Sequence, residues 1–348
     1  MASPYLNNPS AVLPVTIDPR APDRDIQLLK VVGAIVPGWE GCRRAGIMVV
    51  SGGITNQLFR LSAPDKPTAL VRVYGRNTEV VINREAENRL FARLSQEGFA
   101  PTYYGRFENG RVEGWWHGFR PLEPHEMGDA HLRRLIAVKL REMHAIAPLE
   151  PASMLWATLS RWMDTALSLT FEGADAARYA ALDLPRYAET LAALRRSLED
   201  LAPMDPGEAL AEASVLAHND LLSGNILYDD DDEVRFIDYE YGARAPAGFD
   251  IANHFCEYAG FDSDYERGFP TRDVREDFIA AYLGGRATSA IVAGFSRSVD
   301  RYVLVDHFWW GIWAVIQAKY SAIDFDYLEY ARLRLAGYDY HLETLAEG

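Results

Sequence analysis

The chain has 348 residues, enough for one large or two medium domains, and 49% of them are hydrophobic. Its formal net charge of −15, without any basic tract, argues against a nucleic-acid-binding function, because nucleic-acid phosphates reward clustered positive charge. The two cysteines, Cys42 and Cys256, provide no disulfide framework, which favours a reducing compartment.

Residues 1–24 are rich in proline and polar side chains and lack a secretory apolar segment, so we expect them to form a loose leader. The longest apolar run, residues 308–316, is about half of the roughly 20 residues that a membrane-spanning helix needs. The sequence therefore predicts a cytoplasmic protein without a membrane span.

Residues 25–120 are predicted to form a small β-rich lobe. Apolar residues at helical spacing predict a helix over 26–36, ended by Pro37-Gly38. A second helix is expected over 79–94, and Asn109-Gly110 is a strong hairpin signal. The strands expected in this lobe form a five-stranded antiparallel sheet and cover residues 47–50, 56–61, 69–74, 103–107 and 111–116.

Residues 121–348 are predicted to form a larger helical lobe, entered through a crossover at 120–124. A hairpin around Asn225 and Asp238 interrupts the helices, and its acidic run 229–233 is expected to be a solvated turn rather than a metal site. Apart from a helix that begins near Asp129, the helices expected in this lobe cover 154–171, 185–201, 272–283, 290–320 and 325–345. The predicted fold class is α+β, with two lobes.

The most informative segment begins at His218 and reads His218-Asn219-Asp220, followed after four residues by Asn225 and, after the next apolar strand, by Asp238. Transfer of a phosphoryl group from a nucleotide needs a carboxylate to orient the attacking hydroxyl, and an amide and a second carboxylate to hold magnesium. Asp220, Asn225 and Asp238 supply this set in this order, so the spacing predicts a phosphotransferase.

The chain resembles the choline/ethanolamine kinase family, which shares a bilobal fold with protein kinases and aminoglycoside phosphotransferases. Two motifs carry the resemblance: the segment from His218 to Asn225, and Ile237-Asp238-Tyr239-Glu240-Tyr241 continuing through residues 249–257. The similarity extends from about residue 33 to about residue 340. It implies an α+β, protein-kinase-like fold with a small antiparallel β lobe and a large helical lobe.

The resemblance assigns catalytic roles to residues of the two motifs. Asp220 is expected to be the catalytic base, because its carboxylate can aim the substrate hydroxyl at the γ-phosphorus. Asn225 and Asp238 would bind Mg²⁺ as hard oxygen ligands, and Glu240 would complete the metal shell if the strand continues. His218 belongs to the same catalytic set and is expected to brace the loop by hydrogen bonding, with direct chemistry as the alternative.

The expected nucleotide site lies in the β lobe. Glycines in a turn let backbone N–H groups approach phosphate closely, and the predicted phosphate-binding turn comprises Ser51, Gly52, Gly53, Thr55 and Asn56. Arg72 takes the place of the phosphate-binding lysine of protein kinases, as in the resembled family, and a guanidinium grips phosphate oxygens bidentately. Its expected partner is Glu87, with Glu85 as the competitor, and Arg120 completes the set.

The expected alcohol pocket comes from the C-terminal helices. Trp310 and Trp313 are three residues apart and share a helix face, and the resemblance makes them, with Tyr330, the aromatic wall around the amino or trimethylammonium head. Glu257 is expected to add opposite charge to this pocket, with Asp262 as a further candidate. Asp250 is expected to support the catalytic loop instead, and Trp309 to pack in the core.

Ethanolamine is the expected substrate, because segments 70–75, 257–260 and 323–326 are more similar to ethanolamine kinases than to animal choline kinases. The reaction would then be the ATP- and Mg²⁺-dependent first step of the CDP-ethanolamine route to phosphatidylethanolamine. Choline is the first alternative, an antibiotic or sugar phosphotransferase the second, and a non-catalytic relative the third. The bulky crossover at 114–120 leaves ATP, rather than another nucleotide, as an expectation, and a homodimer is expected only by analogy.

Overall fold

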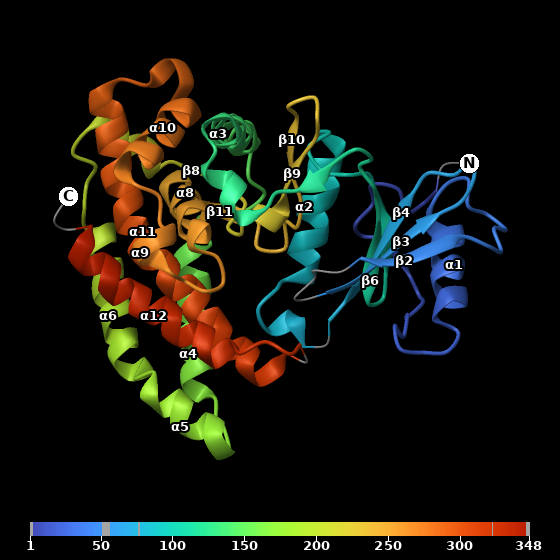
Figure 1. The fold of residues 1–348 in the computed structure, drawn as a ribbon. Helices are drawn as coiled ribbons and strands as arrows, with labels where there is room; N and C mark the ends of the chain where they lie inside the picture. Colours follow the sequence, from blue (N-terminus) through green and yellow to red (C-terminus); the bar gives the residue numbers. More distant parts are fainter. Residues whose placement is uncertain (1–2, 51–55, 76, 322, 346–348) are drawn as a thin grey trace. The chain divides into compact units, whose positions relative to one another are not determined.

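A computed structural model describes residues 3–50, 56–75, 77–321 and 323–345. The chain divides into two units (Figure 1). An N-terminal unit comprises Met1–Phe119 with Ser321–Ile323, and a helical unit comprises Arg120–Tyr320 and Asp324–Gly348. Among the described residues, no helix combines the length and the apolar character needed to cross a membrane.

The N-terminal unit is built on a six-stranded sheet in the order β1-β5-β6-β4-β3-β2. The strands are β1 (Val12–Leu13), β2 (Gly46–Val50), β3 (Asn56–Ser62), β4 (Ala69–Tyr74), β5 (Tyr103–Phe107) and β6 (Gly110–Gly114). The helices of this unit are α1 (Arg24–Ile35), the short 3₁₀ helix η1 (Thr78–Val80) and α2 (Arg84–Gln96). The apolar face of α1 packs with Trp39 and with inward-facing sheet residues such as Phe59 and Val71 to form the core.

The prediction of a loose leader is wrong for the residues near the start of the chain. β1 pairs in parallel with β5, which makes the sheet six-stranded and mixed instead of five-stranded and antiparallel. Asn109 explains why this segment is held: its side chain accepts from the backbone N–H of Ile17 at 3.0 Å and donates to the Ile17 carbonyl at 2.9 Å. The Asn109 side chain therefore satisfies both backbone groups of Ile17, as a neighbouring strand would, and holds the segment that follows β1.

The helix predicted over 79–94 is divided into two. η1 ends at Val80, and α2 begins at Arg84 after Asn83, whose side chain accepts from the backbone N–H of Ala86 at 3.1 Å. Because asparagine is a strong helix N-cap, it starts a new helix where apolar periodicity alone suggested a continuous one.

The helical unit is organised around α11 (Ser289–Tyr320), which packs with α12 (Tyr327–Thr344), α8 (Ala247–Cys256), α7 (Pro206–Ala211), α4 (Leu155–Ser168) and α10 (Arg272–Leu283). Trp309 packs on Trp162 and Phe249, at ring-centroid distances of 4.6 and 5.5 Å, which confirms its predicted core role. The remaining helices are η2 (Pro124–Gly128), α3 (Ala130–His144), α5 (Gly173–Ala181), α6 (Leu184–Glu199), η3 (Ser223–Asn225), η4 (Glu257–Ala259), α9 (Tyr265–Gly268) and η5 (Gly284–Arg286).

Two small sheets of the helical unit position the motif residues. β8 (Ser214–Ala217) pairs with β11 (Ala243–Pro246), and β9 (Ile226–Tyr228) lies between β7 (Arg120–Pro121) and β10 (Val234–Phe236). The segment 218–225 therefore joins the two sheets, and so does the segment 237–242. The acidic run between β9 and β10 forms the predicted turn, in which Asp229 accepts from the backbone N–H groups of Asp231 and Glu233.

Candidate active site

The segment 218–225, which we term the catalytic loop, is held at its start by a buried aspartate of α8. Asp250 accepts hydrogen bonds from the backbone N–H groups of His218, at 2.8 Å, and Asn219, at 2.6 Å. It also lies 2.9 Å from His144 Nε2 of α3. These contacts confirm the predicted supporting role of Asp250. They also hold Asn219 in a left-handed conformation, with φ of 63°, so that the next residue, Asp220, is presented at a sharp turn.

His218 braces the loop from within. Its ring is fully buried, and Nε2 lies 2.9 Å from the carbonyl oxygen of Ile237, the residue before Asp238. Burial lowers the pKa of His218, although Asp250 opposes this effect. A neutral, enclosed imidazole that joins the two motif segments fits the predicted bracing role better than acid–base chemistry.

Asp220 and Asn225 are brought together as the motif predicts. The Asn225 amide donates to the backbone carbonyl of Asp220 at 2.8 Å and to its carboxylate at 3.0 Å. Burial raises the pKa of Asp220 well above its usual value, and the charges of Glu257, Asp238 and Glu240 raise it further. The loop thus holds the Asp220 carboxylate in a fixed direction, where the charges of three other acids act on it.

The acids around Asp220 are arranged differently from the expectation at one point. β10 ends at Phe236, and Asp238 has a left-handed φ of 65°, so the condition that the strand continue through Glu240 is not met. Glu240 is nevertheless only 9% exposed and close enough to act on the charge of Asp220.

The donor set around Asp220 fits a divalent cation. Asn225, Asp238 and Glu240 offer hard oxygen donors, and a bound cation would offset the negative charges of Asp238 and Glu240 that act on Asp220. No group of three or more His, Cys, Asp or Glu side chains is placed to hold a metal within the part of the chain that the structure describes. Magnesium held at this site would therefore need further oxygen ligands, which nucleotide phosphates and water commonly supply.

The N-terminal unit contains a buried cluster of arginines and glutamates around β4. Arg72 lies 3.3 Å from Glu113, and Glu87 binds Arg84 at 2.8 Å and also Arg111. Burial raises the pKa of Glu87, but Arg111, Arg84 and then Arg72 lower it to about 2. Among the described residues, these ion pairs join the guanidinium groups of Arg72, Arg84 and Arg111 to the carboxylates of Glu87 and Glu113.

Glu87 is the acid of α2 that is buried near Arg72, whereas the competitor Glu85 is exposed and binds Arg106 at 2.7 Å. The sequence pattern did not reveal Glu113, Arg84 and Arg111 as members of this cluster. The spacing of Arg84 and Glu87, three residues apart on one helix, was the available signal.

The other predicted nucleotide residues have mixed outcomes. Ser51, Gly52, Gly53 and Thr55 lie outside the described residues. Asn56 is buried, and its side-chain oxygen accepts from Arg84 at 3.1 Å. Arg120 belongs to the helical unit, where its guanidinium forms a bidentate pair with Glu126 at 2.8 and 2.7 Å.

The aromatic wall predicted from α11 has an additional member. Trp310 and Trp313 have ring centroids 5.2 Å apart, and Tyr241 contacts both: its ring lies 5.3 Å from Trp310, and its hydroxyl accepts from Trp313 Nε1 at 2.7 Å. Tyr241 lies in the second sequence motif, three residues after Asp238, and that position was the signal that could have identified it.

Tyr330 belongs to the continuation of this wall. Its ring packs with Phe261 and Phe325 at 5.8 and 5.7 Å. Phe325 contacts Tyr327 at 4.9 Å, and Tyr327 contacts Trp313 at 5.8 Å. The predicted tryptophans and Tyr330 are thus joined by intervening rings.

Glu257 introduces the charge predicted for this pocket. It is 7% exposed, lies 3.3 Å from Arg334, and acts on the charge of Asp220. Burial raises the pKa of Glu257 to about 7, even though Arg334 opposes this shift. An acid that is ionised only in part at neutral pH would gain from a nearby ammonium group.

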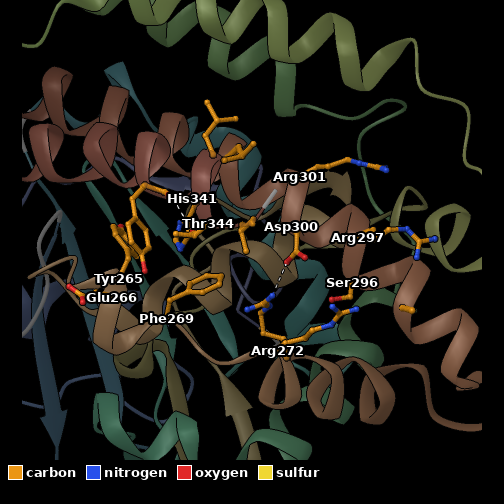
Figure 2. Close-up of a pocket in the computed structure, with 16 residues that line it drawn as sticks. Tyr265, Glu266, Phe269, Arg272, Ser296, Arg297, Asp300, Arg301, His341 and Thr344 are labelled. Carbon is orange, nitrogen blue, oxygen red and sulfur yellow. Dashed lines mark hydrogen bonds and ion pairs between the residues drawn. The ribbon is translucent and has the colours of Figure 1, made fainter. Parts of the chain in front are cut away.

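A separate cavity of about 680 Å³ lies between α9, α10, α11 and the end of α12, and contains none of the predicted site residues. Figure 2 shows Arg272, Arg297 and Arg301 on one side of it and Tyr265 and His341 on the other. The arginines are matched by acids: Arg272 binds Glu276 at 2.9 Å, Arg297 binds Asp205, and Arg301 binds Glu208 at 3.3 Å. This cavity is therefore not an open anion site.

Comparisons with known proteins agree with the class that the fold and the catalytic loop define, a kinase that acts on an alcohol. The family model described as "Choline/ethanolamine kinase" matches residues 47–339. The chain belongs to this family.

Individual relatives give the same family. A probable ethanolamine kinase from Arabidopsis thaliana is 37% identical over 299 residues, covering 83% of this chain and 77% of the relative. Probable choline kinase 3 from the same plant is 32% identical over 337 residues, covering 90% and 92%. The solved structure of Plasmodium vivax ethanolamine kinase has a TM-score of 0.77 and 27% identity, covering 86% and 83%. The predicted kinase-like α+β fold is thereby confirmed.

Proposed function

We propose that this protein transfers the γ-phosphoryl group of ATP to the hydroxyl of ethanolamine and forms phosphoethanolamine. The observation that carries the proposal is the proximity of Asp220, oriented by Asn225, to the buried carboxylate of Glu257. One acid would receive the hydroxyl and the other the ammonium. In ethanolamine these two groups are separated by only two carbon atoms.

Asp220 is the proposed base. Its carboxylate accepts the hydrogen bond of the substrate hydroxyl and aims the oxygen at the γ-phosphorus, which is most of what a loose phosphoryl transition state requires. The raised pKa of Asp220 makes it a better proton acceptor than a solvent-exposed aspartate. Asn225 holds the carboxylate in place throughout.

Asn225, Asp238 and Glu240 are the proposed Mg²⁺ ligands. When bound, the metal would neutralise charge on the nucleotide phosphates. In the N-terminal unit, Arg72 is the proposed phosphate ligand, because its guanidinium lies beside Glu113 in the buried cluster and a guanidinium binds phosphate oxygens bidentately. The proposal also includes ATP as the nucleotide, residues 25–120 as the nucleotide-binding lobe and residues 121–348 as the catalytic lobe. It further includes a cytoplasmic location and a homodimer.

The choice of ethanolamine over choline depends on the mixed character of the pocket. A primary ammonium has three N–H donors, and Glu257 offers an acceptor for them. A trimethylammonium has none and would gain chiefly from the faces of Trp310, Trp313 and Tyr241. The names of the relatives support either substrate, so choline is the second candidate. The aromatic wall disfavours an antibiotic or sugar phosphotransferase, whose polyhydroxylated substrate has no need of it.

The test is ADP release with ATP and Mg²⁺ in the presence of ethanolamine, choline, an aminoglycoside or no acceptor, with Asp220→Asn as the control. We expect kcat/KM to be higher for ethanolamine than for choline, and turnover to be lost in the variant. A preference for choline would overturn the substrate choice but leave the mechanism. Turnover of the aminoglycoside alone would overturn both the substrate class and the proposed role of the wall.

A further inference from the structure

Arg334 of α12 is an enclosed cation between two acids from different segments. Its side chain is 1% exposed, one arm binds the carboxylate of Asp306 on α11, and the other lies 3.3 Å from Glu257 in η4. Both acids are also buried, at 0% and 7% exposed. A guanidinium can serve two carboxylates at once because its five N–H donors form a rigid, planar fork.

The first arm leads to the catalytic loop. Asp306 Oδ1 accepts from the Asn253 amide at 3.0 Å, and the Asn253 oxygen accepts from the backbone N–H of Leu221, the residue after Asp220, also at 3.0 Å. Because the Asn253 NH₂ group donates to Asp306 on α11, the Asn253 oxygen is turned towards the loop. Arg334 thereby stabilises Asp306, which orients Asn253, and Asn253 holds the catalytic loop at Leu221.

The second arm leads to the alcohol pocket. Besides Glu257, Arg334 lies 3.4 Å from the hydroxyl of Tyr330, the ring at the far end of the aromatic wall. Among the charged neighbours of Asp220, Glu257 raises its pKa the most. The two arms of one side chain therefore reach the proposed ammonium acceptor and the backbone next to the proposed base.

We propose that Arg334 is a positioning residue that fixes Glu257 for the substrate ammonium and, through Asp306 and Asn253, holds the backbone beside Asp220. This inference rests on the proposed alcohol phosphorylation and extends it. Arg334 acts through other groups, since its guanidinium is occupied by the two acids. Because one cation supports both functions, its loss should impair substrate binding and turnover together, whereas a change in either branch should impair mainly one.

The role also predicts a change in pH dependence. Removal of Arg334 would raise the pKa of Glu257 above about 7, because burial and Asp306 already raise it and Arg334 opposes them. Glu257 would then be protonated over a wider range, and the acid limb of kcat/KM would move to higher pH. The other titratable groups whose charges interact with Glu257 are Asp220 of the catalytic loop, Cys256 of α8, Tyr265 of α9 and Tyr330 of α12.

The main variant is Arg334→Met, and the matched control is Arg332→Met on the same helix. Arg332 is exposed and binds only a local acid, Glu329, at 2.6 Å among its ion pairs in the described residues. We expect Arg334→Met to lower kcat about 100-fold, the loss that a small misplacement of a reacting group can produce, and to raise KM for ethanolamine. Arg332→Met should leave both constants within about twofold, consistent with a weak surface pair.

Two further variants separate the branches. Asn253→Ala should lower kcat with KM near the wild-type value, because it releases only the catalytic loop. Glu257→Gln should raise KM for ethanolamine with a smaller change in kcat. Arg334→Lys should recover part of the activity of Arg334→Met. Kinetic constants and a pH limb for Arg334→Met that match those of the control would overturn the proposal.

Hydrogen exchange of the catalytic-loop amides, without substrates, tests the first branch independently of turnover. Arg334→Met and Asn253→Ala should speed exchange in residues 218–225 and not throughout the helical unit, and Arg332→Met should not. Unchanged exchange, or a uniform increase, would overturn the proposed relay, by which we mean the chain of contacts from Arg334 through Asp306 and Asn253 to the catalytic loop. If the wild-type protein phosphorylates neither alcohol, the proposed function fails, and the exchange result still decides the relay. If Arg334→Met does not fold, Arg334→Lys and Asn253→Ala decide it.

Discussion

Two aspartates of the helical unit show how the surroundings of a carboxylate separate support from chemistry. Asp250 is fully buried, yet its pKa is lowered, because contacts with His144 and His218 outweigh the effect of burial. Asp220 is also buried, but its pKa is raised by burial and by the neighbouring acids. The fold satisfies the charge of Asp250 and leaves that of Asp220 poorly compensated, as is typical of functional groups.

Replacement of Asp220 by asparagine should therefore stabilise the protein while abolishing turnover. A carboxyl whose pKa is higher in the folded than in the unfolded state costs stability once pH rises above its unfolded value. At pH 8 we expect Asp220→Asn to raise Tm by about 2–4 °C, the change that roughly 1 kcal/mol gives in domains of this size.

Scanning calorimetry at pH 8 and at pH 4 would check this gain, which should shrink at the lower pH. Asp230→Asn, in the exposed acidic turn, is the control and should change Tm little at either pH. A lower Tm for Asp220→Asn at pH 8 would contradict the argument.

At the residue scale, the motif spacing indicated that Asp220 and Asn225 lie together and that Asp250 supports the loop, and the structure shows both contacts. It could not find Arg334 or Arg111. Both are buried cations that pair with acids far away in sequence: Arg334 with Glu257 and Asp306, and Arg111 with Glu87. Arg111 also pairs with Glu113, two residues further on, but an acid at that spacing is equally common beside a surface arginine.

At the scale of elements, strong periodicity predicted long segments well and short ones poorly. α10 begins and ends where predicted, and so does β4. β1 has only two residues, and the four residues of β8 are too few to show a clear alternation of apolar and polar side chains, so their partners β5 and β11 define them. α7 escaped prediction for the same reason, although Asp205-Pro206 is a good helix start.

The contact of α7 with α11 depends on Gly207. A Cβ there would lie 2.2 Å from the Ile291 carbonyl oxygen and 2.7 Å from the Phe295 nitrogen, both backbone atoms of α11. Gly207→Ala must therefore separate two helices, and we expect it to lower the free energy of unfolding by about 1–3 kcal/mol, as overpacking does.

Urea unfolding of Gly207→Ala and of Gly285→Ala would measure this effect. A Cβ at Gly285 meets nothing within 4 Å, and its backbone is not left-handed. The control should therefore shift stability by less than about 1 kcal/mol in either direction. Equal stability of the two variants would show that α7 can move aside without cost.

At the scale of the whole molecule, four of the histidines are buried with lowered pKa values. Burial lowers the pKa of His254 to about 4 and that of His341 to about 3, and it also lowers those of His218 and His307. Histidines in the unfolded chain bind protons near pH 6.5, so the unfolded chain takes up more protons below that pH. Stability should fall as pH drops from about 6.5 towards 4.

Glu257, with a pKa of about 7 in the folded chain, and Asp220, whose pKa is also raised, act in the opposite direction, because each releases a proton on unfolding over the same range. We therefore expect Tm to decline from pH 7 to pH 5, and the decline to be steeper in Glu257→Gln. Calorimetry across this range would check both slopes. A Tm that is constant or rises on acidification would contradict the assignment of neutral buried histidines.

The pairing of β1 with β5 has a consequence for any shortened form of the protein. β5 has β6 on one side and β1 on the other, and Gly105 in β5 approaches so closely that a Cβ would lie 2.5 Å from the Tyr5 Cβ. The first residues thus act as a cover over a strand that would otherwise be open to pairing. A chain trimmed to begin at Asp25 would expose that strand. We expect such a chain to aggregate at high concentration before the arrangement of the acids in the helical unit is disturbed.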